Sequence, residues 1–143
     1  MFVKQISIFI ENKSGRLAEV TRTLANNSID ISALSVADTT DFGILRLIVN
    51  NPDKAEDKLR DAGFTVGITD VIAIAVDDVP GALAKALSTL DNTSVEIEYM
   101  YAFVGKTKDK ALVILKADNK EAAVEKLSAE GVYVLKAEEV YNI

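Results

Sequence analysis

The chain has 143 residues, a net charge of −6 and a pI near 4.7, with 49% hydrophobic and 27% charged residues. It has no cysteine and no histidine, which excludes disulfides, thiolate nucleophiles and the commonest general base and metal ligand. The acidic balance and the lack of a long apolar run lead us to expect a cytoplasmic protein with no nucleic-acid or membrane partner.

The first half alternates between strand and helix patterns. Ile6, Ile8 and Ile10 share one face of a predicted strand. A polar loop follows, and then an apolar stripe from Leu17 to Leu24 at helical spacing predicts a helix. The remaining elements expected in this half are a strand from 29, a hairpin turn at 38–41, a strand at 43–49, a helix from 52 to a C′ glycine at 63, and a strand at 64–68.

The second half repeats the first. Shifted by 66 residues, Ile6 falls on Ile72 and Gly15 falls on Gly81. With one or two extra residues in the second copy, Gly63 falls on Gly131. The second copy is expected to contain strand 71–77, helix 81–91, strand 94–103, strand 110–117, helix 119–130 and strand 132–139.

Each copy therefore has the order β-α-β-β-α-β, the split βαβ arrangement of ferredoxin-like folds. Both helices follow strands, so they should cover the same face of a four-stranded sheet. We expect an α+β protein with two ferredoxin-like βαββαβ domains, at residues 1–69 and 70–143, joined by a short linker at 69–70.

Two loops resemble those of ACT domains. Residues 77–83 read Asp-Asp-Val-Pro-Gly-Ala-Leu, which is similar to the Asp-x-Pro-Gly-x-Leu loop of that family. Residues 11–17 read Glu-Asn-Lys-Ser-Gly-Arg-Leu, with Ser14 where proline is usual, and resemble the Asn-x-x-Gly form of the serine-sensing domains of phosphoglycerate dehydrogenases. Asp30-Ile31 and Glu96-Ile97 stand where ACT domains usually have Asn-Ile.

The resemblance implies a regulatory protein without catalytic activity or cofactor. It would bind a free amino acid at the interface between two ACT domains, whose sheets pair side by side with the helices on one face. The open edges of such a paired sheet favour at least a dimer, so we expect a homodimer. A regulated enzyme or regulator would then act in another chain.

The expected site is the loop before the first helix of a repeat. The free N–H groups of a helix start suit an α-carboxylate, and Asn12, Asp30 or Asp78 would accept hydrogen bonds from the ammonium group. The first loop is favoured, because Asn12, Ser14 and Arg16 offer directed contacts. The candidate ligand-binding residues are Asn12, Lys13, Ser14, Gly15, Arg16, Leu17, Asp30, Ile31, Asp78, Pro80, Gly81 and Leu83.

Plainer interpretations stay open for single residues. Ser14 is equally well interpreted as a helix N-cap, and Arg16 as a solvated surface cation. Tyr99 and Tyr101 should share one face of a strand, where they line the seam between the domains or cap exposed sheet.

Other classes of protein fit the sequence less well. An enzyme would have to rely on carboxylates such as Glu96 and Glu98, without a nucleophile–base pair. An RNA-recognition module needs stacking aromatics, which strand 43–49 lacks, and a metal chaperone needs cysteines. The alternative that remains is an ACT-fold protein-interaction or structural module that binds no small ligand.

Overall fold

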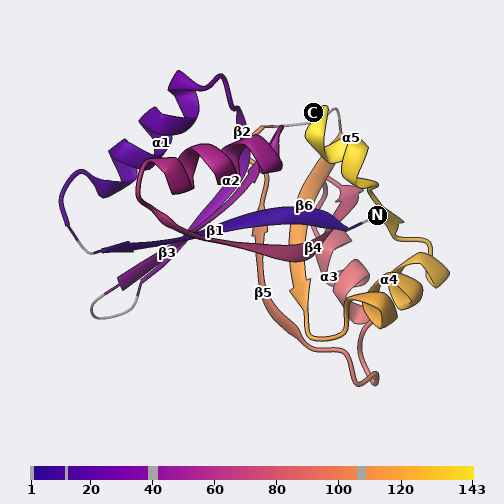
Figure 1. Ribbon diagram of the computed structural model, residues 1–143. Helices are drawn as coiled ribbons and strands as arrows, with labels where there is room; N and C mark the ends of the chain where they lie inside the picture. Colours follow the sequence, from indigo (N-terminus) through magenta and orange to yellow (C-terminus); the bar gives the residue numbers. More distant parts are fainter. Residues whose placement is uncertain (1, 12, 39–41, 106–108) are drawn as a thin grey trace. The chain divides into compact units, whose positions relative to one another are not determined.

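The computed structural model describes residues 2–11, 13–38, 42–105 and 109–143, in the element order shown in Figure 1. The chain divides into two compact units. The N-terminal unit contains Lys4–Thr69 together with Tyr141–Ile143, and the C-terminal unit contains Asp70–Val140 together with residues 2–3. Each unit thus includes described residues from the opposite end of the chain.

The N-terminal unit has the expected β-α-β-β-α-β order. Its sheet has the strand order β2-β3-β1-β4, and β3 is antiparallel to both β1 and β2. Both helices lie on the same side of these strands (Figure 1). The elements are β1 Val3–Glu11, α1 Arg16–Asn26, β2 Ile31–Asp38, β3 Phe42–Val49, α2 Pro52–Asp61 and the first part of β4 Thr65–Asp77.

Alternating residues of the sheet form the core of this unit with the two helices. Ile6 and Ile8 of β1 are fully buried, as are Leu24 of α1 and Leu59 of α2. Full burial of one such side chain contributes about 1.5–3 kcal/mol, so this shared face fixes the register of β1. The predicted strand with Ile6, Ile8 and Ile10 on one buried face is therefore confirmed.

The ends of α2 follow from its sequence. The side chain of Asn51 accepts a hydrogen bond from the Lys54 N–H, and Pro52 occupies the first turn, where no intrahelical donor is lost. Beyond the helix, Gly63 has φ 91°, a left-handed conformation that L side chains rarely adopt. The predicted start and C′ glycine of this helix are confirmed.

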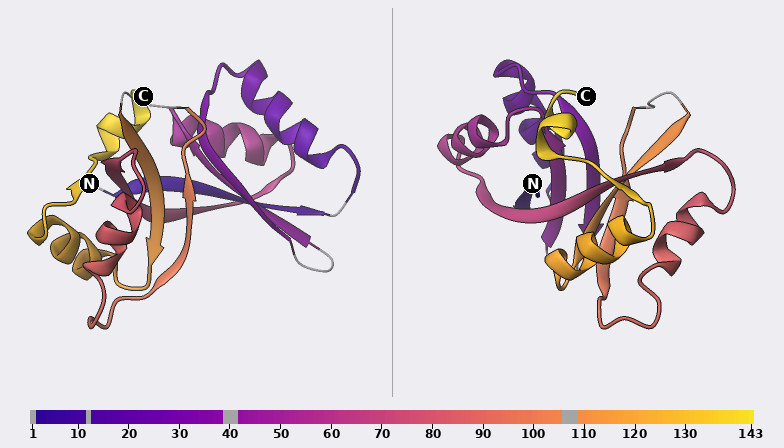
Figure 2. Two further views of the ribbon diagram at one scale, coloured as in Figure 1. Left: turned by 180° about the vertical axis from the view of Figure 1, so that it is seen from behind. Right: turned by 90° about the vertical axis from the view of Figure 1, so that its right-hand side faces the viewer.

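The C-terminal unit has the same topology. Its strand order is β7-β4-β6-β5, and α3 and α4 lie on one face of the sheet (Figure 2). Apolar residues of both helices form one core cluster with residues of the sheet. Its core includes Ile74, Leu115 and Leu127. Its elements are the second part of β4, α3 Ala82–Ser88, β5 Ile97–Ala102, β6 Lys110–Ala117, α4 Lys120–Ala129, β7 Tyr133–Val134 and α5 Ala137–Tyr141.

The last predicted strand, 132–139, is wrong over most of its length. Only Tyr133–Val134 pair with β4, and α5 follows. The backbone N–H of Lys136 donates to the Glu139 carboxylate at 2.7 Å, which holds the start of α5, and Val140 is fully buried. One buried residue per turn suits a short helix better than a strand.

Two further boundary predictions have different outcomes. The two units divide between Thr69 and Asp70, where the linker was predicted, but both residues lie inside β4, a 13-residue strand rich in β-branched side chains, and not in a separate linker. The hairpin turn predicted at 38–41 lies largely outside the described residues, apart from Asp38 at the end of β2.

Candidate ligand-binding sites

The loop before α1 ends in a left-handed glycine. Gly15 has φ 87° and is the N-cap of α1, with no side-chain cap hydrogen bond, so the interpretation of Ser14 as the N-cap is wrong. Lys13 forms an ion pair with Glu11 at 2.8 Å, and its hydrogen bond and charge lower the pKa of Glu11. Asn12, the favoured ligand contact, lies outside the described residues.

Arg16 packs against Phe64, the residue just before β4, instead of extending into solvent. Its guanidinium carbon lies 4.7 Å from the centroid of the Phe64 ring, within the range of a cation–π interaction. Its Nη1 lies 2.9 Å from the Glu19 carboxylate, and the side chain is 26% exposed. Its Nε is buried and has no hydrogen-bond partner among the described residues. The interpretation of Arg16 as a solvated surface cation is therefore wrong.

Asp30 and Ile31 lie at the other end of the N-terminal sheet from this loop. Ile31 pairs with Val49, whereas Glu11, just before the loop, pairs with Phe42. The length of β3 separates these pairs, about 23 Å at the usual rise per residue. Within this unit, therefore, the two parts of the expected site are not brought together.

Asp30 also has a structural role. Its backbone N–H donates to the Asn50 side chain at 3.0 Å, and the Asn50 N–H donates back to the Asp30 carbonyl at 3.1 Å. In the second repeat, Glu96 and Asp118 make the same reciprocal pair at 2.9 and 3.0 Å. These bonds hold the start of the second strand of each repeat to the end of the third.

The second loop borders an open pocket of about 930 Å³, here called the loop pocket. Pro80 and Gly81 line it, and Gly81 has φ 89° as the N-cap of α3. Asp78 is exposed and lies outside the lining, and its backbone N–H donates to the Asp109 carbonyl at 3.1 Å. Leu83 packs against the core of the unit. The other walls are α3 from Ala82 to Ser88, the end of β4, Lys110 of β6 and residues 130–133.

Charges of both signs line the loop pocket. Asp77 accepts a hydrogen bond from Lys110, and this bond, with the charges of Lys110 and Lys85, lowers the pKa of Asp77. Lys85 lines the same pocket and forms no ion pair with any residue that the structure describes. An ionised carboxylate and an ammonium group without an ion-pair partner thus share one cavity.

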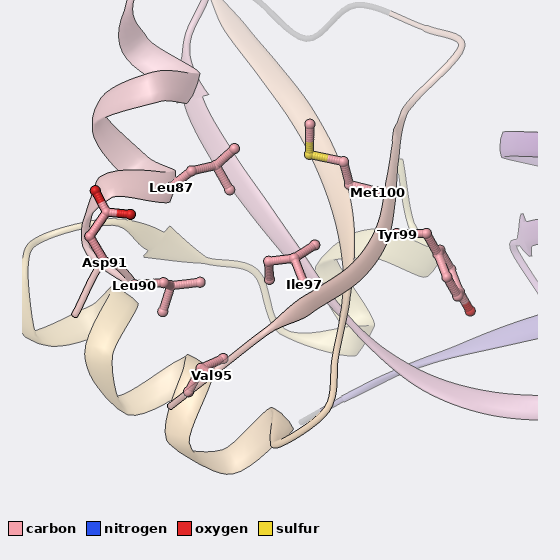
Figure 3. Close-up of a pocket in the computed structure, with 7 residues that line it drawn as sticks. All are labelled: Leu87, Leu90, Asp91, Val95, Ile97, Tyr99 and Met100. Atoms are coloured by element: carbon pink, nitrogen blue, oxygen red, sulfur yellow. The ribbon is translucent and has the colours of Figure 1, made fainter. Parts of the chain in front are cut away.

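A second pocket, of about 420 Å³, lies between α3 and the edge strand β5 and is here called the edge pocket. Figure 3 shows Leu87 on the helix facing Ile97 and Met100 on the strand. Tyr99 points to the opposite side of β5 in the same view. Asp91 supplies the carboxylate of this mainly aliphatic lining, and no Lys or Arg takes part in it. The edge pocket is therefore poorly suited to a zwitterion.

The predicted placement of the two tyrosines on one face of β5 is confirmed. The Tyr99 and Tyr101 rings stack with centroids 6.5 Å apart and an angle of 19° between their planes. On the same strand, Glu98 forms an ion pair with Lys116 at 3.0 Å. A glutamate neutralised in this way is a poor candidate for a catalytic carboxylate.

Two of the charged residues that line the loop pocket were missed by sequence reasoning. Lys85 and Lys110 stand 25 positions apart in the sequence, and only the fold brings them together around Asp77. A usable signal was present, because Lys85 occupies the repeat position of Glu19 and so reverses its charge. In the described part of the chain no group of three or more acidic side chains is placed to hold a metal ion, and no helix has the length and apolarity to span a membrane.

Solved structures of other proteins have the same architecture as this chain. Protein BT0572 from Bacteroides thetaiotaomicron is 48% identical, with a TM-score of 0.93, over 100% of this chain and 98% of that one. The ligand-free regulatory subunit of aspartate kinase from Thermus thermophilus has a TM-score of 0.65 at 18% identity, over 90% and 91% of the two chains. The regulatory subunit of aspartate kinase from Thermus flavus has a TM-score of 0.60 at 18% identity, over 91% and 93%.

The two Thermus structures share the fold with this chain. No curated protein gives a significant sequence match. The family described as the ACT domain pair matches residues 1–142, and this match covers both repeats. The chain therefore belongs to the ACT domain pair family.

Proposed function

We propose that this protein is a regulatory ACT domain pair that binds a free amino acid and catalyses no reaction itself. The observation that carries the proposal is the loop pocket, where Lys85 and Asp77 present opposite charges beside the Pro80-Gly81 loop. A free amino acid carries a carboxylate and an ammonium group on one carbon, so it needs a cation and an anion side by side.

In this proposal each charged group of the ligand has a named partner. Lys85 holds the α-carboxylate, and Asp77 accepts a hydrogen bond from the α-ammonium. Lys110 donates to Oδ1 of Asp77, which leaves Oδ2 for the ligand. A hydrogen bond to a charged group contributes about 1.5–3 kcal/mol. Gly81 lets the ligand approach the backbone closely, because it has no Cβ.

The regulatory part of the proposal has separate support. Two proteins with the same fold are regulatory subunits of aspartate kinase. Both repeats of this chain are accounted for by ACT-type units, since the ACT domain pair model covers residues 1–142. We therefore propose that ligand binding is sensed by an enzyme or regulator in another chain.

Thermal unfolding with each proteinogenic amino acid at millimolar concentration tests the ligand proposal. A ligand present at a hundred times its dissociation constant adds about 2.7 kcal/mol to the free energy of unfolding, which raises Tm by several degrees. We expect one amino acid or a chemically related group to do so, and Lys85→Ala to abolish the shift. Lys126→Ala, which removes a cation of α4 outside the pocket lining, is the matched control.

A protein-interaction module is the second candidate, and the edge pocket favours it. Met100 is 44% exposed on the edge strand beside this aliphatic pocket, a surface suited to an apolar side chain of a partner. If no amino acid raises Tm, the ligand proposal is contradicted and this candidate takes its place.

A further inference from the structure

The two repeats differ at the position of the loop pocket. The backbones of the two loops have the same conformation at this position, as the φ angles of 87° at Gly15 and 89° at Gly81 show. The Phe64 N–H donates to the Leu59 carbonyl at 3.0 Å, and the same bond is made in the second repeat from 132 to 127, also at 3.0 Å. The side chains on these matching backbones are nevertheless of different size and charge.

In the N-terminal unit three side chains occupy this position. Arg16 lies over the Phe64 ring at 4.7 Å and is held by Glu19 at 2.9 Å. Phe64 is only 6% exposed, so its ring belongs to the core beneath the guanidinium. These three residues, which we call the arginine plug, cover the place between the start of α1 and the start of β4.

In the C-terminal unit the counterparts of the plug are Ala82, Lys85 and Val132. All three line the loop pocket. Replacing arginine by alanine and phenylalanine by valine removes the side chains that would fill this volume. Replacing glutamate by lysine leaves a cation that forms no ion pair with a carboxylate among the described residues.

We propose that each chain binds one amino acid, in the loop pocket of the C-terminal unit, and that Arg16 closes the equivalent position of the N-terminal unit. The identity of the ligand class rests on the proposed function, whereas the asymmetry rests on the comparison of the two repeats. The N-terminal loop then serves to build the fold, and the C-terminal loop serves to bind.

Transplanting the plug tests this proposal. The triple variant Ala82→Arg/Lys85→Glu/Val132→Phe rebuilds the N-terminal arrangement in the C-terminal unit. We expect its Kd for the amino acid that raises the Tm of the unmodified protein to increase about tenfold to hundredfold, from the loss of one charged hydrogen bond and of the cavity. Ala84→Arg adds the charge of the Ala82→Arg change alone, on an exposed position of α3 outside the pocket lining, and should leave the Kd unchanged.

Calorimetric titration of the unmodified protein gives the stoichiometry, which we expect to be one amino acid per chain. Far-UV circular dichroism checks that the triple variant is folded. If it is not, Ala82→Arg alone is used, because it changes one side chain at the start of α3 and should also weaken binding.

The outcomes separate this inference from the proposed function. Two ligands per chain, or full binding by a folded plug variant, would overturn the inference and leave amino-acid binding intact. Absence of binding of any amino acid to the unmodified protein would overturn both.

Discussion

Arg16 shows how one side chain decides between a structural and a functional role. Sequence reasoning placed it among the ligand contacts, because its side chain can make directed contacts. In the fold it is bound to Phe64 and Glu19 of its own unit. Its buried Nε, without a partner among the described residues, shows that this arrangement is maintained at some cost in hydrogen bonding.

We expect Arg16→Ala to destabilise the protein modestly, by about 0.5–2 kcal/mol, the usual range of a cation–π contact. The ion pair with Glu19 adds little, because the glutamate is 47% exposed and solvent screens the charge. Urea unfolding of this variant measures the loss. Arg22→Ala on the exposed part of α1 is the control and should unfold at nearly the same urea concentration as the parent. Equal stability of all three proteins would show that the plug contributes nothing to folding.

Asn51 and Asn119 are repeat-related caps, and we expect each to contribute similarly. Each side chain accepts a hydrogen bond from the backbone N–H three residues on, at 3.2 and 3.1 Å. Asn51→Ala and Asn119→Ala should each lower the free energy of unfolding by about 1 kcal/mol. Additive losses in the double variant, measured by urea unfolding, are expected for sites without shared partners. Replacement by Asp, which can cap in the same way, should retain most of the stability.

At the scale of elements, the C-terminal segment shows why the last strand was not predictable. Residues 132–139 correspond to a strand in the first repeat, so the repeat itself argued for a strand. Local hydrogen bonds favour the short helix α5 instead, because the Glu139 carboxylate accepts hydrogen bonds from both the Lys136 N–H and the Tyr133 hydroxyl. No periodicity reveals such a pair of bonds in advance, whereas the longer elements, with buried faces at regular spacing, were predictable.

This arrangement makes α5 sensitive to acid. The hydrogen bond from Tyr133, and then the one from the Lys136 N–H, lower the pKa of Glu139 below its ordinary value of 4.5. A carboxyl group with a depressed pKa in the folded state stabilises that state above its ordinary pKa, and this contribution is lost as the pH falls through the folded value. We expect the NMR titration of Glu139 to have its midpoint below 4.5 and Tyr133→Phe to move it upward. An unchanged midpoint in Tyr133→Phe would contradict the role given to the hydroxyl.

The candidate site was predictable only in part, and the reason lies in the spacing of its residues. The Pro80-Gly81 loop is a contiguous motif, so it could be found in the sequence. Lys110 comes from β6 and reaches the pocket only through the antiparallel pairing of β6 with β4. Long-range pairing of this kind is invisible to a search for motifs.

At the scale of the whole molecule, the two edge strands offer surfaces through which a second copy of the chain could pair. Among the described residues β2 pairs only with β3, and β5 only with β6. Leu34 and Val36 of β2 are 43% and 47% exposed, and Met100 of β5 is 44% exposed. Unpaired edges with apolar side chains favour addition of a further strand, which supports our proposal of a homodimer.

We expect sedimentation to show a dimer and a charge on an edge strand to shift it toward monomer. Val36→Lys and Met100→Lys test the two edges separately. Lys58→Glu, on the exposed face of α2, is the control for a change of charge. A parent protein that sediments as a monomer at all concentrations would contradict the homodimer, and the variant that weakens association identifies the edge used.

The exchange of chain ends between the units bears on how the protein is made. Phe2 packs against the core of the C-terminal unit, with Lys120 5.1 Å above its ring, and the Lys4 N–H donates to the Tyr141 hydroxyl at 2.9 Å in the N-terminal unit. The N-terminal unit thus lacks one of its contacts until Tyr141 has been synthesised. Removal of Tyr141–Ile143 should therefore disturb the N-terminal unit, and replacement of Phe2 should disturb the C-terminal unit.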